Sequence, residues 1–312
     1  MKIVFLDRKT LGDDVDLSGF ERFGEVKIYD MTSPEEAPER VKDADILVVN
    51  KVPVNEQTCG GAKKLQLICE AATGTNNLDK DFLARRGIPW RNVGGYSTES
   101  VVQHTFAMLF YLFEHVPYYD HYVKSGEYMR SDCFTHFAAT FHELAGKRWG
   151  IIGLGTIGSR VAQVAQAFGC RVQYYSASGH NHNLLYDQVD LDTLLATSDI
   201  ISIHTALTDA TYHLINQKTL GKMKKSAYLI NVGRGPIIDE KALVDALNEG
   251  QIAGAGLDVL DKEPMEEASP IWNVKNKDNL LITPHVAWGT VEARQRLMKK
   301  VEKQVEEFLR YK

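Results

Sequence analysis

Short apolar runs alternate with polar, helix-like stretches along the first hundred residues of this chain. The apolar runs occupy residues 3–6, 26–29, 46–49 and 65–69, and residues 34–41 have a polar helical pattern. Short apolar runs between polar segments are typical of buried strands, and their alternation with helices is typical of β-α-β units. The pattern therefore predicts a parallel sheet with helices on its faces.

A second series of apolar runs begins at residue 149. Its members are residues 149–152, 172–175, 200–203, 228–232, 254–257 and 280–283. Their spacing again fits β-α-β units. We therefore predict an α/β protein with two doubly wound parallel-sheet domains.

Two longer helical patterns, at residues 98–113 and 290–311, lie outside these series. The second follows the last strand of the second sheet and is apolar on one face. Its apolar residues are Leu297, Val301, Val305, Phe308 and Leu309. We expect this helix to return to the first sheet. A discontinuous domain (residues 1–99 and 288–312) would then enclose an inserted domain (residues 100–287).

Composition narrows the class of protein. The chain has 312 residues, 44% of them hydrophobic and 25% charged, with a net charge of -5, which fits an ordinary globular protein of two domains. It has no basic run that suggests nucleic acid and no apolar stretch of about 18 residues that suggests a membrane span. The N-terminal segment predicts a strand rather than a signal peptide, so we expect a cytoplasmic protein with four reduced cysteines. No metal-binding motif is found.

A glycine-rich turn lies between the strand at residues 149–152 and a helical pattern. Gly153 permits a tight turn, Gly155 lets a pyrophosphate approach the backbone, and Gly158 lets helix and strand pack closely. The helix N-terminus adds free N–H groups. This setting predicts a Rossmann dinucleotide-binding domain inserted into a flavodoxin-like substrate domain. The alternative is a strand–turn–helix whose glycines serve packing alone.

One arginine, one glutamate and one histidine follow strands of the second series. Arg234 comes after the strand at 228–232, Glu263 lies six residues past residue 257, and His285 follows the strand at 280–283. Ligands bind beyond the carboxyl ends of parallel strands, so we expect these side chains at one edge of the sheet.

These residue types suit the reduction of a 2-keto acid. A guanidinium fork binds a carboxylate, and an imidazole can give a proton to the carbonyl oxygen while a hydride reaches C2. A carboxylate beside the imidazole favours its protonated form. Taken singly, Arg234 could bind a phosphate, Glu263-Pro264 could start a helix, and His285 could be a capping or core histidine. The ordered set of three favours catalysis.

Six segments resemble the D-isomer-specific 2-hydroxyacid dehydrogenases, and the resemblance spans nearly the whole chain. They are residues 153–158, 204–208, 231–235, 256–259, 263–264 and 283–288. The resemblance implies that Arg234 binds substrate, that His285 is the acid/base, and that Glu263 pairs with it. Residues 72–77 and 95–105 most resemble glycerate dehydrogenases (hydroxypyruvate reductases).

The same resemblance implies the rest of the site. Thr73 and Gly74 match a segment whose backbone N–H groups hold the substrate carboxylate, and Asp258 matches a residue that contacts the nicotinamide amide. The expected cofactor-binding residues are Gly153, Gly155, Thr156, Ile157, Ser176, Ser178, Thr205, Ala206, Val232, Gly233 and Asp258. Family members are usually homodimers, so a homodimer is expected here.

Two positions depart from the family pattern. Ala206 stands where a proline is common, and a small effect on the loop is expected. Ser176 stands where NAD-preferring members carry an acid for the ribose hydroxyls. Ser178, His180 and His182 are nearby polar groups, but residues 172–217 contain no Arg or Lys to attract a 2′-phosphate. The sequence favours NAD and leaves NADP open.

The predicted function is the reversible reduction of a small 2-keto acid, similar to hydroxypyruvate or glyoxylate, to the D-2-hydroxy acid by NAD(P)H. The alternative is a nucleotide-sensing binding protein or corepressor on the same scaffold. A third possibility, formate dehydrogenase, lacks its usual N-terminal extension here. Turnover of 2-keto acids distinguishes an enzyme from a binding protein.

Overall fold

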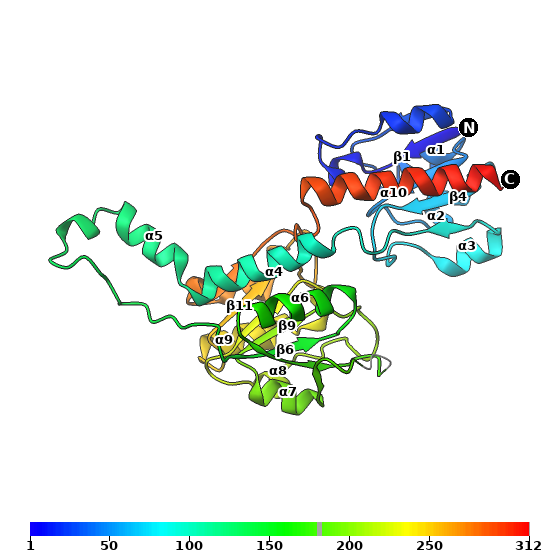
Figure 1. Cartoon of the computed structure of the whole chain (residues 1–312). Helices are drawn as coiled ribbons and strands as arrows, with labels where there is room; N and C mark the ends of the chain where they lie inside the picture. Colours follow the sequence, from blue (N-terminus) through cyan, green and yellow to red (C-terminus); the bar gives the residue numbers. More distant parts are fainter. Residues whose placement is uncertain (180–182, 312) are drawn as a thin grey trace. The chain divides into compact units, whose positions relative to one another are not determined.

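The computed structural model describes residues 1–179 and 183–311, and it divides into two compact units. Unit 1 consists of residues 1–97 and 288–312, and unit 2 consists of residues 98–287. Figure 1 shows each unit as a sheet with helices packed on it. The chain crosses from one unit to the other at two places, so unit 1 is discontinuous.

Within the described residues, unit 1 has a five-stranded parallel sheet in the order β2-β1-β3-β4-β5. This is the flavodoxin-like order 2-1-3-4-5. The strands are β1 (Lys2–Phe5), β2 (Glu25–Ile28), β3 (Ile46–Val49), β4 (Leu67–Glu70) and β5 (Trp90–Arg91). The helices are α1 (Ala37–Val41), α2 (Glu56–Cys59), α3 (Lys80–Arg86) and α10 (Val291–Arg310), with short 3-10 turns at Arg8–Leu11 and Ser18–Phe23.

Alternate residues of the strands in unit 1 pack on its two faces. On one face, α10 covers Ile3 and Phe5 with a stripe of buried residues that includes Leu297, Val301 and Val305. The side chain of Thr290 accepts a hydrogen bond from the N–H of Ala293 and so begins this helix. The C-terminal helix therefore returns to the first sheet, as its apolar face predicts (Figure 1).

Unit 2 has, within the described residues, a seven-stranded parallel sheet in the order β12-β11-β10-β9-β6-β7-β8. Counted from β6, this is the Rossmann order 3-2-1-4-5-6 with a seventh strand added. The strands are β6 (Arg148–Ile152), β7 (Arg171–Tyr175), β8 (Asp187–Gln188), β9 (Ile200–Ile203), β10 (Tyr228–Asn231), β11 (Gly254–Leu257) and β12 (Leu280–Ile282). The helices are α4 (Thr98–Phe113), α5 (Val116–Lys124), α6 (Thr156–Ala167), α7 (Leu191–Thr197), α8 (Gln217–Leu220) and α9 (Glu240–Asn248), with short 3-10 turns at Tyr128–Arg130, Gly235–Ile237, Pro270–Asn273 and Lys277–Asn279.

Both faces of the sheet in unit 2 are buried. Ile151 faces a cluster with α4 and α6, whereas the next residue, Ile152, faces a cluster with α7, α8 and α9. This alternation explains why the central strands β6, β9 and β10 are mostly apolar. Two doubly wound parallel sheets, one Rossmann and one flavodoxin-like, confirm the predicted fold class.

The structure adds elements that the apolar pattern did not predict. The two-residue strands β5 and β8 and the helix α5 have no strong periodicity, and β4 begins two residues later than the run at 65–69. Residues 114–147 form an extended segment around α5, which we call the arm; Figure 1 shows it projecting from the strands of unit 2. The predicted polar groups His180 and His182 lie outside the described residues.

Candidate functional site

The glycine-rich turn joins β6 to α6 at the edge where the strand order of unit 2 reverses. Gly153 has φ of 93°, which glycine alone adopts readily, and a Cβ on Gly158 would lie 2.2 Å from the carbonyl oxygen of Gly153. A Cβ on Gly155 would meet nothing within 4 Å, so the backbone there is open. Gly155 caps α6 without a side-chain bond, and Thr156 and Ile157 begin the helix. These features suit a diphosphate group.

The loops after β9 and β10 lie against this turn. A Cβ on Gly153 would come within 2.9 Å of Thr205, and a Cβ on Gly233 within 3.1 Å of the Thr205 carbonyl oxygen. Val232, the residue before Gly233, is half-buried. At the exposed Ala206, the Thr211 hydroxyl donates to the Ala206 carbonyl (2.8 Å). The loop is thus fixed without the proline that is common in the family.

Ser176 and Ser178 follow β7, beside the glycine-rich turn. The N–H of Gly153 donates to the carbonyl of Tyr175 (3.0 Å), the residue before Ser176. Ser176 is buried and Ser178 is exposed. The position that would carry an acid for the ribose hydroxyls therefore holds a small neutral side chain next to the turn.

The loop that carries Arg234 is held from both sides. The buried Asn231 side chain donates to the Arg234 carbonyl (2.9 Å) and accepts from the N–H of Gly233 (3.0 Å). A Cβ on Gly235 would lie 1.9 Å from the backbone of Leu260. Glycine is thus required at position 235, because the Arg234 loop packs directly on the loop that leads to Glu263.

Glu263 and His285 form a hydrogen-bonded pair. Glu263 Oε2 lies 2.7 Å from His285 Nδ1, and their side chains are 33% and 23% exposed. Glu263 Oε1 accepts from the N–H of Leu260 (3.0 Å), which fixes the carboxylate. Because a carboxylate accepts the Nδ1 proton, Nε2 is the ring nitrogen left to exchange a proton with a ligand.

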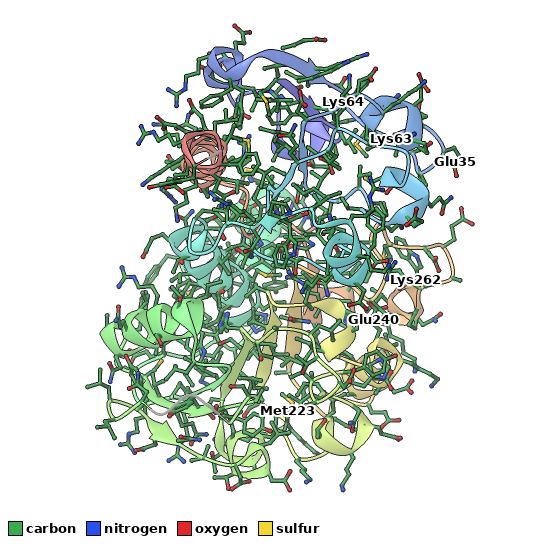
Figure 2. The ribbon with its side chains drawn as sticks, turned by 90° about the vertical axis from the view of Figure 1, so that its right-hand side faces the viewer. Glu35, Lys63, Lys64, Met223, Glu240 and Lys262 are labelled. Carbon is green, nitrogen blue, oxygen red and sulfur yellow. The ribbon has the colours of Figure 1, made fainter. Side chains whose placement is uncertain are left out.

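The loop between β11 and Glu263 is also tied to α9. Glu240, at the first turn of α9, accepts from the N–H of Asp261 (2.8 Å). Figure 2 labels Glu240 and Lys262, which mark the place where the two segments meet. Since β10, β11 and β12 are neighbours in that order, Arg234, Glu263 and His285 all follow the carboxyl ends of adjacent strands.

Asp258 is almost completely buried, at 1% exposed. Its carboxylate accepts from the N–H groups of Val286 (2.8 Å) and Ala287 (2.9 Å) and from the Thr283 hydroxyl (2.6 Å). It therefore holds the turn around His285. Its contact with a nicotinamide amide stays a prediction, and Oδ2 has one further acceptor position for such a group.

A second histidine, His204, lies near the glycine-rich turn and is unsuited to proton transfer. Burial lowers the pKa of His204 to about 3, so the ring is neutral at physiological pH. Its Nε2 lies 2.9 Å from the hydroxyl of Ser202. This leaves His285 as the acid/base candidate of these two histidines.

Thr73 and Gly74 lie in unit 1, on the loop that follows β4. The Thr73 hydroxyl donates to the carbonyl of Val93 (2.9 Å), and the Asn92 side chain donates to the Thr73 carbonyl (2.7 Å). The residue that ends β4, Glu70, is fully buried and accepts from the Asn77 side chain (2.9 Å). The loop is thus fixed at both ends within unit 1.

Several supporting residues were assigned no role in the sequence analysis. Asn231, Thr283 and Glu70 are polar residues at the ends of apolar runs, and a polar residue at the end of a buried strand is a usable signal. The tyrosines and phenylalanines of the arm were a second signal that the sequence analysis did not use.

Among the described residues, no group of three or more His, Cys, Asp or Glu is arranged to hold a metal ion. None of the helices described is long and apolar enough to cross a membrane.

Comparison with known sequences identifies the family. Residues 106–287 match the model of the D-isomer specific 2-hydroxyacid dehydrogenase, NAD binding domain. A hydroxypyruvate reductase from Blautia hydrogenotrophica is 38% identical over 318 residues, which cover 99% of this chain and 97% of that protein. A glycerate dehydrogenase from Methylorubrum extorquens is 38% identical over 309 residues, with coverage of 99% and 96%.

Solved structures agree with this assignment. The TT0316 protein from Thermus thermophilus has a TM-score of 0.89 at 28% identity, with coverage of 100% of this chain and 98% of that one. The D-lactate dehydrogenase from Aquifex aeolicus, solved with NAD and lactic acid, has a TM-score of 0.86 at 29% identity, with coverage of 99% and 95%. The chain therefore belongs to the D-isomer specific 2-hydroxyacid dehydrogenase family of NAD-dependent oxidoreductases, as its motifs predict.

Proposed function

We propose that this enzyme reduces a small 2-keto acid of the hydroxypyruvate and glyoxylate class to the D-2-hydroxy acid. The observation that carries the proposal is the Glu263–His285 pair, with 2.7 Å between Oε2 and Nδ1. Glu263 follows β11 and His285 follows β12, and β11 is the neighbour of β10, which Arg234 follows. The names of the relatives, hydroxypyruvate reductase and glycerate dehydrogenase, favour this substrate class.

The roles of the three residues follow from their chemistry. Arg234 binds the substrate carboxylate through its guanidinium fork, which orients C2. The protonated Nε2 of His285 gives its proton to the carbonyl oxygen, and Glu263 stabilises the charged ring through Nδ1. When bound, NADH supplies the hydride to C2. Within unit 1, Thr73 and Gly74 offer backbone N–H groups to a substrate carboxylate, as the family resemblance implies.

The cofactor would bind along the carboxyl edge of the sheet in unit 2. Gly153, Gly155, Thr156 and Ile157 would hold the diphosphate at the N-terminus of α6. Ser176 and Ser178 would face the adenosine ribose. Thr205, Ala206, Val232, Gly233 and Asp258 would contact the rest of the dinucleotide. We expect NAD to be preferred over NADP, because the described loop residues after β7 carry no positive side chain for a 2′-phosphate.

We also propose that the enzyme is a homodimer whose interface includes the arm. All nine residues of α5 are at least partly exposed, and Met129, Phe134 and Phe137 are 84%, 85% and 75% exposed. An exposed apolar surface of this kind is typical of a protein interface. A second copy suits it, because the family resemblance implies a homodimer; within the arm, His136 stacks on Tyr122 with 3.8 Å between ring centroids.

The dimer has a direct test. Light scattering on the wild type should give twice the chain mass of 35.0 kDa. The double variant Phe134→Asp, Phe137→Asp should give the single chain mass with its secondary structure intact. A wild type that is monomeric at micromolar concentration contradicts the proposal.

The four cysteines, all within the described residues, are free, which suits the reducing cytoplasm in which we expect the enzyme.

The substrate class is tested by NADH oxidation with a panel of 2-keto acids. Hydroxypyruvate and glyoxylate should have the highest kcat/KM, ahead of pyruvate and of 2-keto acids with branched side chains. NADPH in place of NADH measures the cofactor preference in the same assay. Cofactor binding without turnover on any member would favour a nucleotide-sensing binding protein instead.

A further inference from the structure

The turn that carries His285 has a backbone conformation that needs support. His285 has φ of 54°, in the left-handed region that is unfavourable for residues with a Cβ. Such a conformation persists only where surrounding contacts determine it. The residues that hold this turn therefore decide where the imidazole points.

Asp258 supplies that support to three consecutive residues. Its backbone carbonyl accepts from the N–H of His285 (2.8 Å). Its Oδ1 accepts from the N–H of Val286 (2.8 Å) and its Oδ2 from the N–H of Ala287 (2.9 Å). A rotation of the Asp258 carboxylate would break two of these bonds at once, so its orientation controls the turn.

Two further residues fix the orientation of that carboxylate. Thr283 Oγ1 lies 2.6 Å from Asp258 Oδ1 and 3.0 Å from His104 Nε2. An ionised carboxylate only accepts, so Thr283 gives its one hydroxyl proton to Asp258. The Thr283 oxygen must then accept from His104, which fixes the ring tautomer with its proton on Nε2. His104 Nε2 is also 3.5 Å from Asp258 Oδ1.

We propose that His104 and Thr283 are positioning residues for the proton transfer by His285. They form one hydrogen-bonded chain from α4 through the end of β12 to Asp258, and Asp258 holds the turn. This inference rests on the proposed role of His285 as the acid/base. A misplaced imidazole slows the proton transfer and leaves the binding of the substrate carboxylate by Arg234 unaffected.

The first test compares two substitutions of Thr283. Thr283→Val keeps the shape and removes the hydroxyl, whereas Thr283→Ser keeps the hydroxyl. We expect Thr283→Val to lower kcat by roughly tenfold to a hundredfold, with KM for the keto acid within about twofold of the wild type. Thr283→Ser should retain most of kcat. Thr105→Val is the matched control. Among the described residues, the buried Thr105 hydroxyl bonds only the Val101 carbonyl of its own helix (2.8 Å), so the kcat of this variant should be unchanged.

The second test uses His104, whose side chain is 23% exposed. His104→Leu should lower kcat as Thr283→Val does, and His104→Gln, whose amide can donate to Thr283, should recover part of the loss. His285→Gln in the same assays separates the two hypotheses. If His285→Gln is inactive while Thr283→Val and His104→Leu keep the wild-type kcat, the positioning role alone is overturned. If His285→Gln stays active, the proposed function itself fails.

Discussion

A buried carboxylic acid at the end of β4, before the loop that carries Thr73 and Gly74, makes the stability of the enzyme depend on pH. Glu70 is 0% exposed at the end of β4, Asn77 donates to its Oε2, and its Oε1 has no hydrogen-bond partner among the described residues. Burial, reinforced by the nearby Asp7 carboxylate, raises the pKa of Glu70 from 4.5 to about 9. The folded protein thus holds this proton at neutral pH, whereas the unfolded chain releases it.

The size of the effect follows from this difference. Between the unfolded and folded pKa values, the free energy of unfolding falls as pH rises by about 1.4 kcal/mol per pH unit, and the accumulated cost at pH 7 is roughly 3 kcal/mol. Glu70→Gln removes the titration. The free energy of unfolding of the variant, relative to wild type, should therefore rise with pH, whatever constant offset the buried amide introduces.

The assay is urea unfolding, followed by tryptophan fluorescence, between about pH 5.5 and pH 8.5 for both proteins. Trp90 and Trp288 report on unit 1, which contains Glu70. Glu39→Gln, on a side chain that is 84% exposed, is the matched control. It should follow the wild type at each pH. Parallel curves for Glu70→Gln and wild type would refute the reasoning, because they would mean that Glu70 does not retain its proton on folding.

Three further predictions concern the site. Arg234→Ala should lower kcat/KM on the order of a hundredfold or more with the fold intact, because a guanidinium–carboxylate pair is lost, and near-normal kcat/KM would remove Arg234 from the site. Glu263→Gln should lower activity less than loss of His285 and should move one limb of the pH–rate profile; an unmoved profile would make Glu263 structural. Ser176→Asp should shift the ratio of kcat/KM for NADH over NADPH towards NADH, because the carboxylate accepts from the ribose hydroxyls and repels a 2′-phosphate. A ratio that does not move, or a wild-type preference beyond about a thousandfold, would mean that the loop after β7 reads the ribose differently.

Strongly periodic segments could be predicted from the sequence. Central strands such as β3 and β9 are apolar along most of their length because both faces of the sheet are covered there, and the helix at residues 98–113 has the bounds of α4. The doubly wound architecture then follows from the alternation of strands and helices. The C-terminal helix could be assigned to the first sheet because its apolar stripe needed a partner that the completed second sheet did not offer.

The remaining features depend on contacts between distant residues. The strand β8 has only two residues, both exposed, and the helix α5 has no buried residue, so neither is marked by an apolar run in the sequence. The Gly235 requirement arises because Leu260 approaches from the loop after the neighbouring strand β11. The chain from His104 to Asp258 joins residues separated by more than 150 positions, and no local pattern predicts it. A single sequence could indicate the type of chemistry but could not reveal which residues hold it in place.

The central claim is that His285 transfers the proton in the reduction of a 2-keto acid. The most direct measurement compares wild type and His285→Gln in single-turnover reduction of hydroxypyruvate by NADH, with NADH affinity measured separately by fluorescence titration. The account predicts a rate lower by roughly 10²–10⁴-fold in the variant, with NADH affinity within about twofold of wild type. A variant that reduces hydroxypyruvate within about tenfold of the wild-type rate would contradict the claim, because another group would then supply the proton.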